Sequence, residues 1–162
     1  VWVSRTVKWK RALSVFMLPY YANVNKVESP FEIQKFVREV RSGDYDSFFR
    51  RLQSFFADTT YEVIREQELH YENVLFIVFK LVGFYTKVEY HTNNGRIDLV
   101  LQTDKFIYIM EFKLNGTAEE ALRQIEDKHY ARPFATDSRK LFKIGVNFSV
   151  ETRNIEKWLV EN

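Results

Sequence analysis

The sequence predicts an α/β domain, in which helices flank a mixed central sheet of about four to five strands and an extra helical pair lies on the N-terminal side. Residues 96–102 and 106–113 are rich in β-branched and aromatic residues, and turn-compatible residues separate them, as in a β-hairpin. A helical pattern after Gly116 leads to an apolar strand pattern at residues 141–147, and this order indicates a β-α-β unit. Two amphipathic patterns before residue 60 supply the helical pair.

Length and composition are those of a folded protein. The 162 residues are 46% hydrophobic and include 15 Phe, so the chain can bury a real core and disorder is excluded. The net charge of +2 does not by itself demand a nucleic-acid partner. The absence of cysteine excludes disulfides, cysteine zinc sites and a thiol nucleophile, and it agrees with a cytoplasmic location. The longest apolar run, residues 74–79, is far too short to span a membrane.

The helical pair is expected at residues 29–41 and 44–57. Ser29 and Pro30 are typical of a helix start, and Gly43 is typical of the residue that ends a helix. The many Phe side chains on these helices favour a packing layer or partner-binding element over a ligand pocket.

A third helix is expected to start after Thr60 or within residues 62–66 and to end near Val82. We therefore expect two regions, a connector with the helical pair at residues 1–60 and a second domain at residues 61–162. The chain begins without Met, which suggests a piece of a longer protein. The other elements expected are a strand at residues 84–91, a turn at residues 92–95, a helix that starts after Thr117 and ends before Pro133, and strands at residues 141–147 and 154–160.

The predicted hairpin brings three charged side chains together. If Asp104 and Lys105 are its loop residues, Asp98 lies directly opposite Glu111, and directly opposite residues share a face. Side chains alternate along a strand, so Lys113 emerges on the same face. The rest of this face is apolar, with Val100, Ile107 and Ile109.

Two carboxylates that face each other destabilise a sheet unless something compensates for their repulsion. Lys113 can do part of this, and a divalent cation can do the rest, because Mg²⁺ prefers one or two carboxylates plus waters and phosphate oxygens. The arrangement suits metal-assisted hydrolysis of a phosphodiester, with the Lys113 ammonium orienting the attacking water or stabilising charge. The competing interpretation is that Asp98, Glu111 and Lys113 are ordinary strand residues in solvent.

Beyond this spacing, the run GRIDLVLQTDKFIYIMEFK resembles the core motif of the PD-(D/E)XK nuclease superfamily, here as Asp98, twelve intervening residues and Glu111-Phe112-Lys113. More narrowly, the chain resembles the nuclease-like domain at the C-terminus of bacterial proteins whose N-terminal part is AAA-ATPase-like. Further runs that carry this resemblance are LPYY at residues 18–21, GDYDSF at residues 43–48, TNNGRIDLV at residues 92–100, EFKLNGTAEEALRQIEDKHYA at residues 111–131 and GVNFSVETRNIEKW at residues 145–158.

The resemblance implies a restriction-endonuclease-like core and a metal-dependent nuclease that hydrolyses phosphodiester bonds of nucleic acid. Asp98 and Glu111 would bind Mg²⁺, or Mn²⁺ in its place, and the Phe112 carbonyl would add a backbone oxygen. It also implies that Glu68, on the preceding helix, is a third acidic residue of the metal site. The competing interpretation is that Glu68 is a solvated residue in the first turn of that helix, where the helix dipole favours an acid. Glu72, one turn further along, is the competing candidate.

Further site residues follow from the same resemblance. Gln124 would lie near the metal, where its amide contacts substrate or a water, and Lys128 and Tyr130 would contact the nucleic-acid backbone. Arg96 would contact phosphate or merely pair with Glu89. Gln124 and Lys128 are spaced four apart, so they share one helix face. The competing interpretation is that both are ordinary exposed helix residues.

The expected partners are nucleic acid, DNA rather than RNA, and an ATPase-like domain of the full-length protein. No membrane partner is expected, and a homo-oligomer is left open. The alternative function is a catalytically silent module that binds nucleic acid or protein and is coupled to the ATPase-like domain. A small-molecule enzyme has little support, because no Gly-rich phosphate loop or serine triad pattern is visible.

Overall fold

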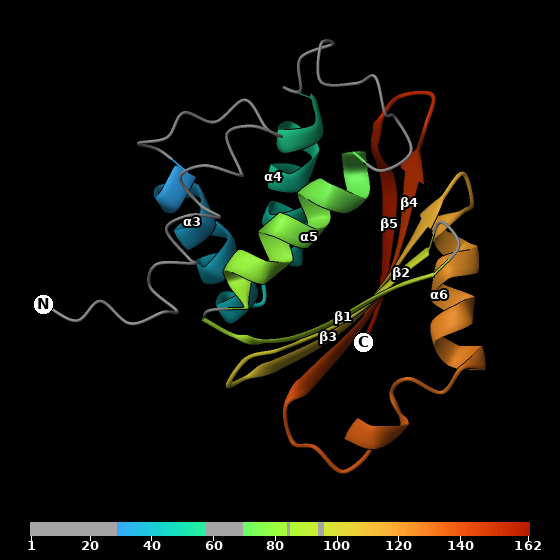
Figure 1. Cartoon of the computed structure of the whole chain (residues 1–162). Helices are drawn as coiled ribbons and strands as arrows, with labels where there is room; N and C mark the ends of the chain where they lie inside the picture. Colours follow the sequence, from blue (N-terminus) through green and yellow to red (C-terminus); the bar gives the residue numbers. More distant parts are fainter. Residues whose placement is uncertain (1–28, 58–69, 84, 94–95) are drawn as a thin grey trace, which may run out of the picture. The chain divides into compact units, whose positions relative to one another are not determined.

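The computed structural model describes residues 29–57, 70–83, 85–93 and 96–162 (Figure 1). The chain divides into two compact units, Val1–Thr86 and Lys87–Asn162. The boundary expected near residue 60 stays a prediction, because residues 58–69 lie outside the described ranges. Within the described ranges, no helix is long and apolar enough to cross a membrane.

The first unit contains three described helices. The predicted pair is confirmed as α3, Ser29–Ser42, and α4, Tyr45–Ala57, and α5, His70–Val82, ends at the predicted residue. The pair is joined through Gly43, whose φ of 82° suits glycine. Aromatic rings fill the space between the helices, since the Phe36 ring lies edge-on at 5.2 Å from both Phe48 and Phe55. The Phe side chains of α4 are thus core residues, as predicted.

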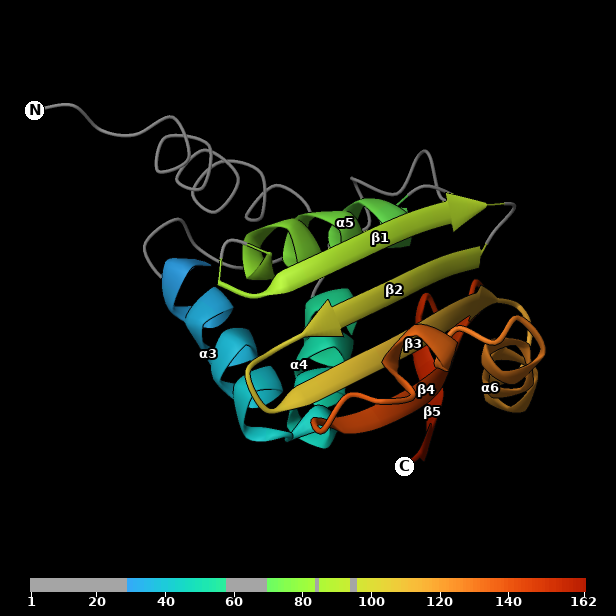
Figure 2. The same cartoon turned by 90° about the horizontal axis from the view of Figure 1, so that it is seen from below.

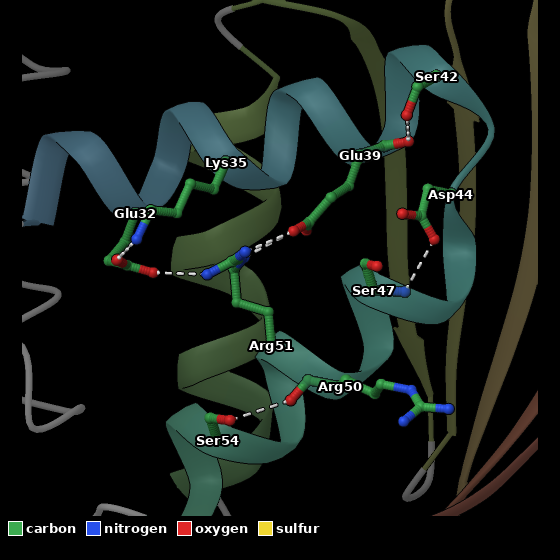
Figure 3. Close-up of polar contacts among 9 residues, drawn as sticks. All are labelled: Glu32, Lys35, Glu39, Ser42, Asp44, Ser47, Arg50, Arg51 and Ser54. Atoms are coloured by element: carbon green, nitrogen blue, oxygen red, sulfur yellow. Dashed lines mark hydrogen bonds and ion pairs between the residues drawn. The ribbon is translucent and has the colours of Figure 1, made fainter.

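A polar network also ties α3 to α4 (Figure 3). The Arg51 guanidinium donates to Glu39 Oε1 at 2.6 and 2.9 Å and to Glu32 Oε2 at 3.0 Å. It also lies 5.8 Å from the centroid of the Phe36 ring. Burial alone would lower the pKa of Arg51, but the hydrogen bond and charge of Glu39, with those of Glu32, raise it. Arg51 is therefore held in its charged form between two carboxylates.

The second unit is built on a five-stranded sheet in the order β1-β2-β3-β4-β5 (Figure 2). The pair β3 and β4 is parallel and the other neighbours are antiparallel, so the predicted mixed α/β sheet is confirmed. The strands are β1 Lys87–Asn93, β2 Arg96–Gln102, β3 Phe106–Leu114, β4 Lys140–Ser149 and β5 Asn154–Glu161.

Both predicted ends of the first strand need correction. β1 begins at Lys87 instead of residue 84, because the N–H groups of Tyr85 and Thr86 donate to the Val82 carbonyl at 2.9 and 3.1 Å and prolong the end of α5. β1 also continues to Asn93, where a turn was expected from Thr92. The ladder with β2 holds these residues in the sheet, and only residues 94–95, which the structure does not describe, lie between the strands.

The crossover from β3 to β4 runs through α6, Ala118–Asp127. The helix starts after Thr117, as predicted, with a capping box: Thr117 Oγ1 accepts the Glu120 N–H and Glu120 Oε2 accepts the Thr117 N–H, both at 3.0 Å. α6 ends well before Pro133, which lies in the short helix η3, Arg132–Phe134.

Close packing fixes α6 on the sheet. A Cβ at Gly145 of β4 would lie 2.2 Å from the Ala118 carbonyl oxygen, so only glycine allows this approach. Ile125 of α6 packs against Ile107 and Ile109 of β3. α6 therefore covers the face of the sheet on which the predicted site lies.

Candidate active site

The β2 and β3 hairpin has the predicted register. Asp98 pairs directly with Glu111, so both carboxylates lie on the face that α6 covers. Lys113, two residues further along β3, lies on the same face. Three apolar side chains continue it and pack in one cluster with α6: Val100, Ile107 and Ile109.

Burial gives this pair of carboxylates an unusual setting. Glu111 is fully buried, with 0% of its surface exposed, and Asp98 is half-buried. A buried carboxylate is costly, and a second one directly opposite adds repulsion. Neighbouring polar groups or a bound cation must offset that cost. The pair therefore tends to destabilise the fold, but it is well suited to binding a cation.

Tyr130 contacts the site directly. It lies in the turn that follows α6, and its hydroxyl donates a 2.8 Å hydrogen bond to Asp98 Oδ2. This contact is with the carboxylate that was predicted to bind metal, whereas Tyr130 was expected to contact nucleic acid. The hydroxyl thus occupies one oxygen of Asp98 and fixes the orientation of that carboxylate.

Gln124 and Lys128 lie on the same side of α6, as their spacing predicts. Lys128 caps the helix, and its N–H donates to the Gln124 carbonyl at 3.1 Å. The Lys128 ammonium lies 5.3 Å from the centroid of the Tyr130 ring. Gln124 Oε1 and Lys128 Nζ are both buried, and neither has a hydrogen-bond partner in the described part of the chain. A buried ammonium of this kind is ready to accept an anionic ligand.

The motif residues Phe112 and Lys113 differ in what they bring to the site. The Phe112 side chain is buried and alternates to the opposite face, so at this position only the backbone can contribute to the site. Lys113 is half-buried, and its stem lies against the loop after β3, where a Cβ at Gly116 would be 3.0 Å from Lys113 Cδ. That contact restricts the positions that the Lys113 ammonium can occupy.

The structure does not place three of the predicted positions as side chains. Glu68 lies outside the described residues, and the side chain of Glu72, on α5, is not described either. Arg96 is described as backbone only, paired with Asn93 on one side and Lys113 on the other. Their roles remain predictions.

One residue that the sequence analysis missed is His91. It pairs directly with Asp98 across β1 and β2, so His91, Asp98 and Glu111 form one row across three strands. His91 is exposed at the outer strand, while Glu111 is buried. The signal was available: if Asn94 and Gly95 are read as a two-residue loop, His91 falls opposite Asp98 by the same arithmetic that pairs Asp98 with Glu111.

Comparison with known proteins agrees with this geometry. A family model described as the PD-(D/E)XK nuclease superfamily matches residues 66–158, more than half of the chain. The chain belongs to this superfamily. Asp98 and the Glu111-Phe112-Lys113 run, which resemble the motif of this superfamily, lie within the matched residues.

A search of curated proteins finds a relative in Azotobacter chroococcum mcd 1, described as an uncharacterized protein in the vnfD 5′ region. It is 27% identical over 128 residues, which make up 75% of this chain and 25% of that protein. The chain therefore spans about a quarter of the length of this relative.

PD-(D/E)XK nucleases generally use divalent metals, and the residues of this member fit such an ion. Two opposed carboxylates, one of them buried, are the oxygen ligands that Mg²⁺ takes together with water and substrate. Among the described residues, no group of three or more His, Cys, Asp or Glu side chains is arranged to hold a metal. Within the described part of the chain, the site thus offers two opposed carboxylates.

Proposed function

We propose that this domain is a metal-dependent nuclease that hydrolyses phosphodiester bonds of nucleic acid, with DNA as its preferred substrate over RNA. The observation that carries the proposal is the direct opposition of Asp98 and buried Glu111, with Lys113 on the same face, in a member of a nuclease superfamily. A lone E-x-K pattern in a strand is common, but this one coincides with the register and the family match.

In this proposal, Asp98 and Glu111 hold Mg²⁺, or Mn²⁺ in its place, and the Phe112 carbonyl adds a backbone oxygen. When bound, the cation polarises the phosphoryl group and lowers the pKa of a water molecule. Lys113 orients the attacking water and stabilises the negative charge that develops on the phosphoryl oxygens. Glu68 supplies a further carboxylate.

The groups on α6 and in the turn after it complete the proposed site. Lys128 contacts a phosphate, which gives its buried ammonium an anionic partner. The Gln124 amide contacts the substrate or a water beside it, and Arg96 contacts a further phosphate. Tyr130 holds Asp98 through its hydroxyl and flanks the nucleic-acid backbone. Positioning of this kind contributes to rate because reacting groups must be held within narrow limits.

An alternative is a catalytically silent module that binds nucleic acid or protein and is coupled to an ATPase-like domain in the full-length protein. It is favoured by the length of the Azotobacter relative, of which the match covers only a quarter. The two proposals differ in one prediction. The nuclease needs Asp98 for cleavage, whereas binding by a silent module is unaffected by Asp98→Ala.

A cleavage assay separates these proposals. Wild type and Asp98→Ala are incubated with labelled single-stranded and duplex DNA and with RNA, with Mg²⁺, with Mn²⁺ or with EDTA. The nuclease proposal expects metal-dependent cleavage, strongest on DNA, that is lost in Asp98→Ala while the circular dichroism of the fold is unchanged. Lack of cleavage by folded wild type on every substrate would overturn it for this domain.

A further inference from the structure

The exposed edge of the site carries a group with no assigned role, the His91 imidazole. His91 lies directly opposite Asp98, on the strand at the outer edge of the sheet. In the described part of the chain, no hydrogen bond or ion pair engages its ring, and its side chain is exposed. A solvent-facing imidazole beside a catalytic carboxylate is available to a ligand.

A role as third metal ligand does not fit the arrangement. A cation held by Asp98 and Glu111 lies toward β3, whereas His91 lies on the other side of Asp98, on β1. Neighbouring strands are about 5 Å apart, which puts His91 roughly 10 Å from Glu111 across the sheet. Consistent with this, no three such groups among the described residues are arranged to hold a metal.

The surroundings favour contact with the substrate instead. α6 packs on β3, β4 and β5, and the side chains of β1 that are described on the site face, Lys87, Glu89 and His91, are exposed. Nucleic acid bound at the carboxylates can therefore extend over β1. Glu89, the next residue along this face, forms a 3.6 Å ion pair with Lys87, but both side chains are exposed, so the pair reduces the repulsion of a polyanion by Glu89 without cancelling it.

The charges on either side of His91, along the strand direction, favour one path for the substrate over the site face. One step beyond His91 toward the loop, the row across the strands ends at the basic Lys113 of β3, and one step in the other direction lies the acidic Glu89. A polyanion is therefore drawn to the row of His91 and away from that of Glu89.

We propose that the His91 imidazole N–H donates a hydrogen bond to the phosphate next to the scissile one, so that the substrate strand crosses the sheet from β3 toward β1. This inference rests on the proposed nuclease function and adds a contact with the substrate. A neutral imidazole always carries one N–H, so the contact does not require a charged ring. It positions the scissile phosphate over the carboxylates, as contacts to phosphates position nucleic acid generally.

The test uses the full chain and a fluorescein-labelled oligodeoxynucleotide, with binding measured by anisotropy in EDTA and cleavage measured in Mg²⁺. His91→Ala and His91→Phe are each expected to weaken binding and raise KM about tenfold, because a hydrogen bond to a charged group is lost. His91→Gln, which retains an N–H donor, keeps most of the affinity. Lys87→Ala removes a cation from the same face of the same strand and is expected to cost less.

A chemical change in the substrate locates the contact. A methylphosphonate in place of the flanking phosphate removes its charge and one of its two non-bridging acceptor oxygens, so the wild-type affinity falls and the further loss caused by His91→Ala becomes smaller than with the phosphate. Wild-type binding by His91→Ala, full retention by His91→Phe, or equal losses from Lys87→Ala would each overturn the proposal. If wild type never cleaves but binding still depends on His91, the contact stands and the nuclease function fails.

Discussion

The two units of this chain each hold a pair of carboxylates, and they treat their charges in opposite ways. In the helical unit, Glu32 and Glu39 lie on either side of Arg51, which donates to both (Figure 3). In the sheet unit, Asp98 and Glu111 face each other directly, and Asp98 accepts a hydrogen bond from the neutral hydroxyl of Tyr130.

This difference indicates that the charged groups of the helical unit serve stability, whereas those of the sheet unit serve function. A cation between two acids gains hydrogen bonds and cancels repulsion, so the helical network stabilises the fold once it is assembled. Two opposed carboxylates in a buried setting lower the stability of the fold, and residues that lower stability are often found at functional sites. The Asp98 and Glu111 pair is expected to be worth more to activity than to the fold.

The largest expected effect comes from Glu111→Gln, which keeps the shape and removes one charge. We expect kcat/KM for DNA cleavage to fall by about a thousandfold, because metal-assisted catalysis contributes several kcal/mol. The free energy of unfolding in urea should stay the same or rise by about 1 kcal/mol, since the repulsion is removed. A loss of more than that amount would mean that Glu111 mainly supports the fold.

The helical network should show the reverse pattern. Arg51→Met leaves Glu39, whose side chain is only 10% exposed, without its guanidinium partner, and should lower the free energy of unfolding by about 2 kcal/mol. Cleavage by the folded fraction should be unchanged. Arg50→Met is the matched control, because Arg50 is 72% exposed and pairs with exposed Asp46, so its loss should cost less than about 0.5 kcal/mol. Equal effects of the two changes would remove the distinction drawn between the units.

Tyr130→Phe tests whether the hydrogen bond to Asp98 serves metal binding or the stability of the fold. It deletes only the hydroxyl that donates to Asp98, so metal affinity and kcat/KM should each fall about tenfold, as for other groups that orient metal ligands. The free energy of unfolding should change by about 1 kcal/mol or less. Unchanged metal affinity, measured by titration calorimetry, would mean that the hydroxyl does not orient the carboxylate for the metal.

The smallest expected effect concerns Asp137, a carboxylate paired in the loop before β4. The side-chain and backbone hydrogen bonds of Arg139 lower the pKa of Asp137 to about 2. A lowered pKa stabilises the fold above the unfolded value near 4, and this contribution disappears as the pH falls toward 2. Urea unfolding should show Asp137→Ala as less stable than wild type at neutral pH, with the difference vanishing over that range. A difference that persists at about pH 2 would show that the loss is not due to the charge.

Local patterns in the sequence predicted most of the fold. Turn residues and alternation gave the β2 and β3 register, and Thr117 with Glu120 gave the start of α6. These features depend on neighbours along the chain. The start of β1 could not be predicted in this way. The N–H groups of residues 85 and 86 bond back to the Val82 carbonyl at the end of α5, and composition does not indicate these hydrogen bonds.

The site divides in the same manner. Asp98, Glu111 and Lys113 follow from the hairpin alone, whereas the bond from Tyr130 to Asp98 joins residues 32 positions apart and depends on how α6 packs at Gly145. His91 was missed although its register was readable, because the expected strand ends at residue 91 and the expected turn takes all of residues 92–95, whereas β1 continues to Asn93.

The most direct test of the central claim is a calorimetric titration of Mg²⁺ and Mn²⁺ into wild type and Asp98→Ala. We predict that wild type binds the cation and that Asp98→Ala does not, while both remain folded. Absence of cation binding by wild type, or equal binding by the two proteins, would contradict the claim that the opposed carboxylates of the sheet form a metal site.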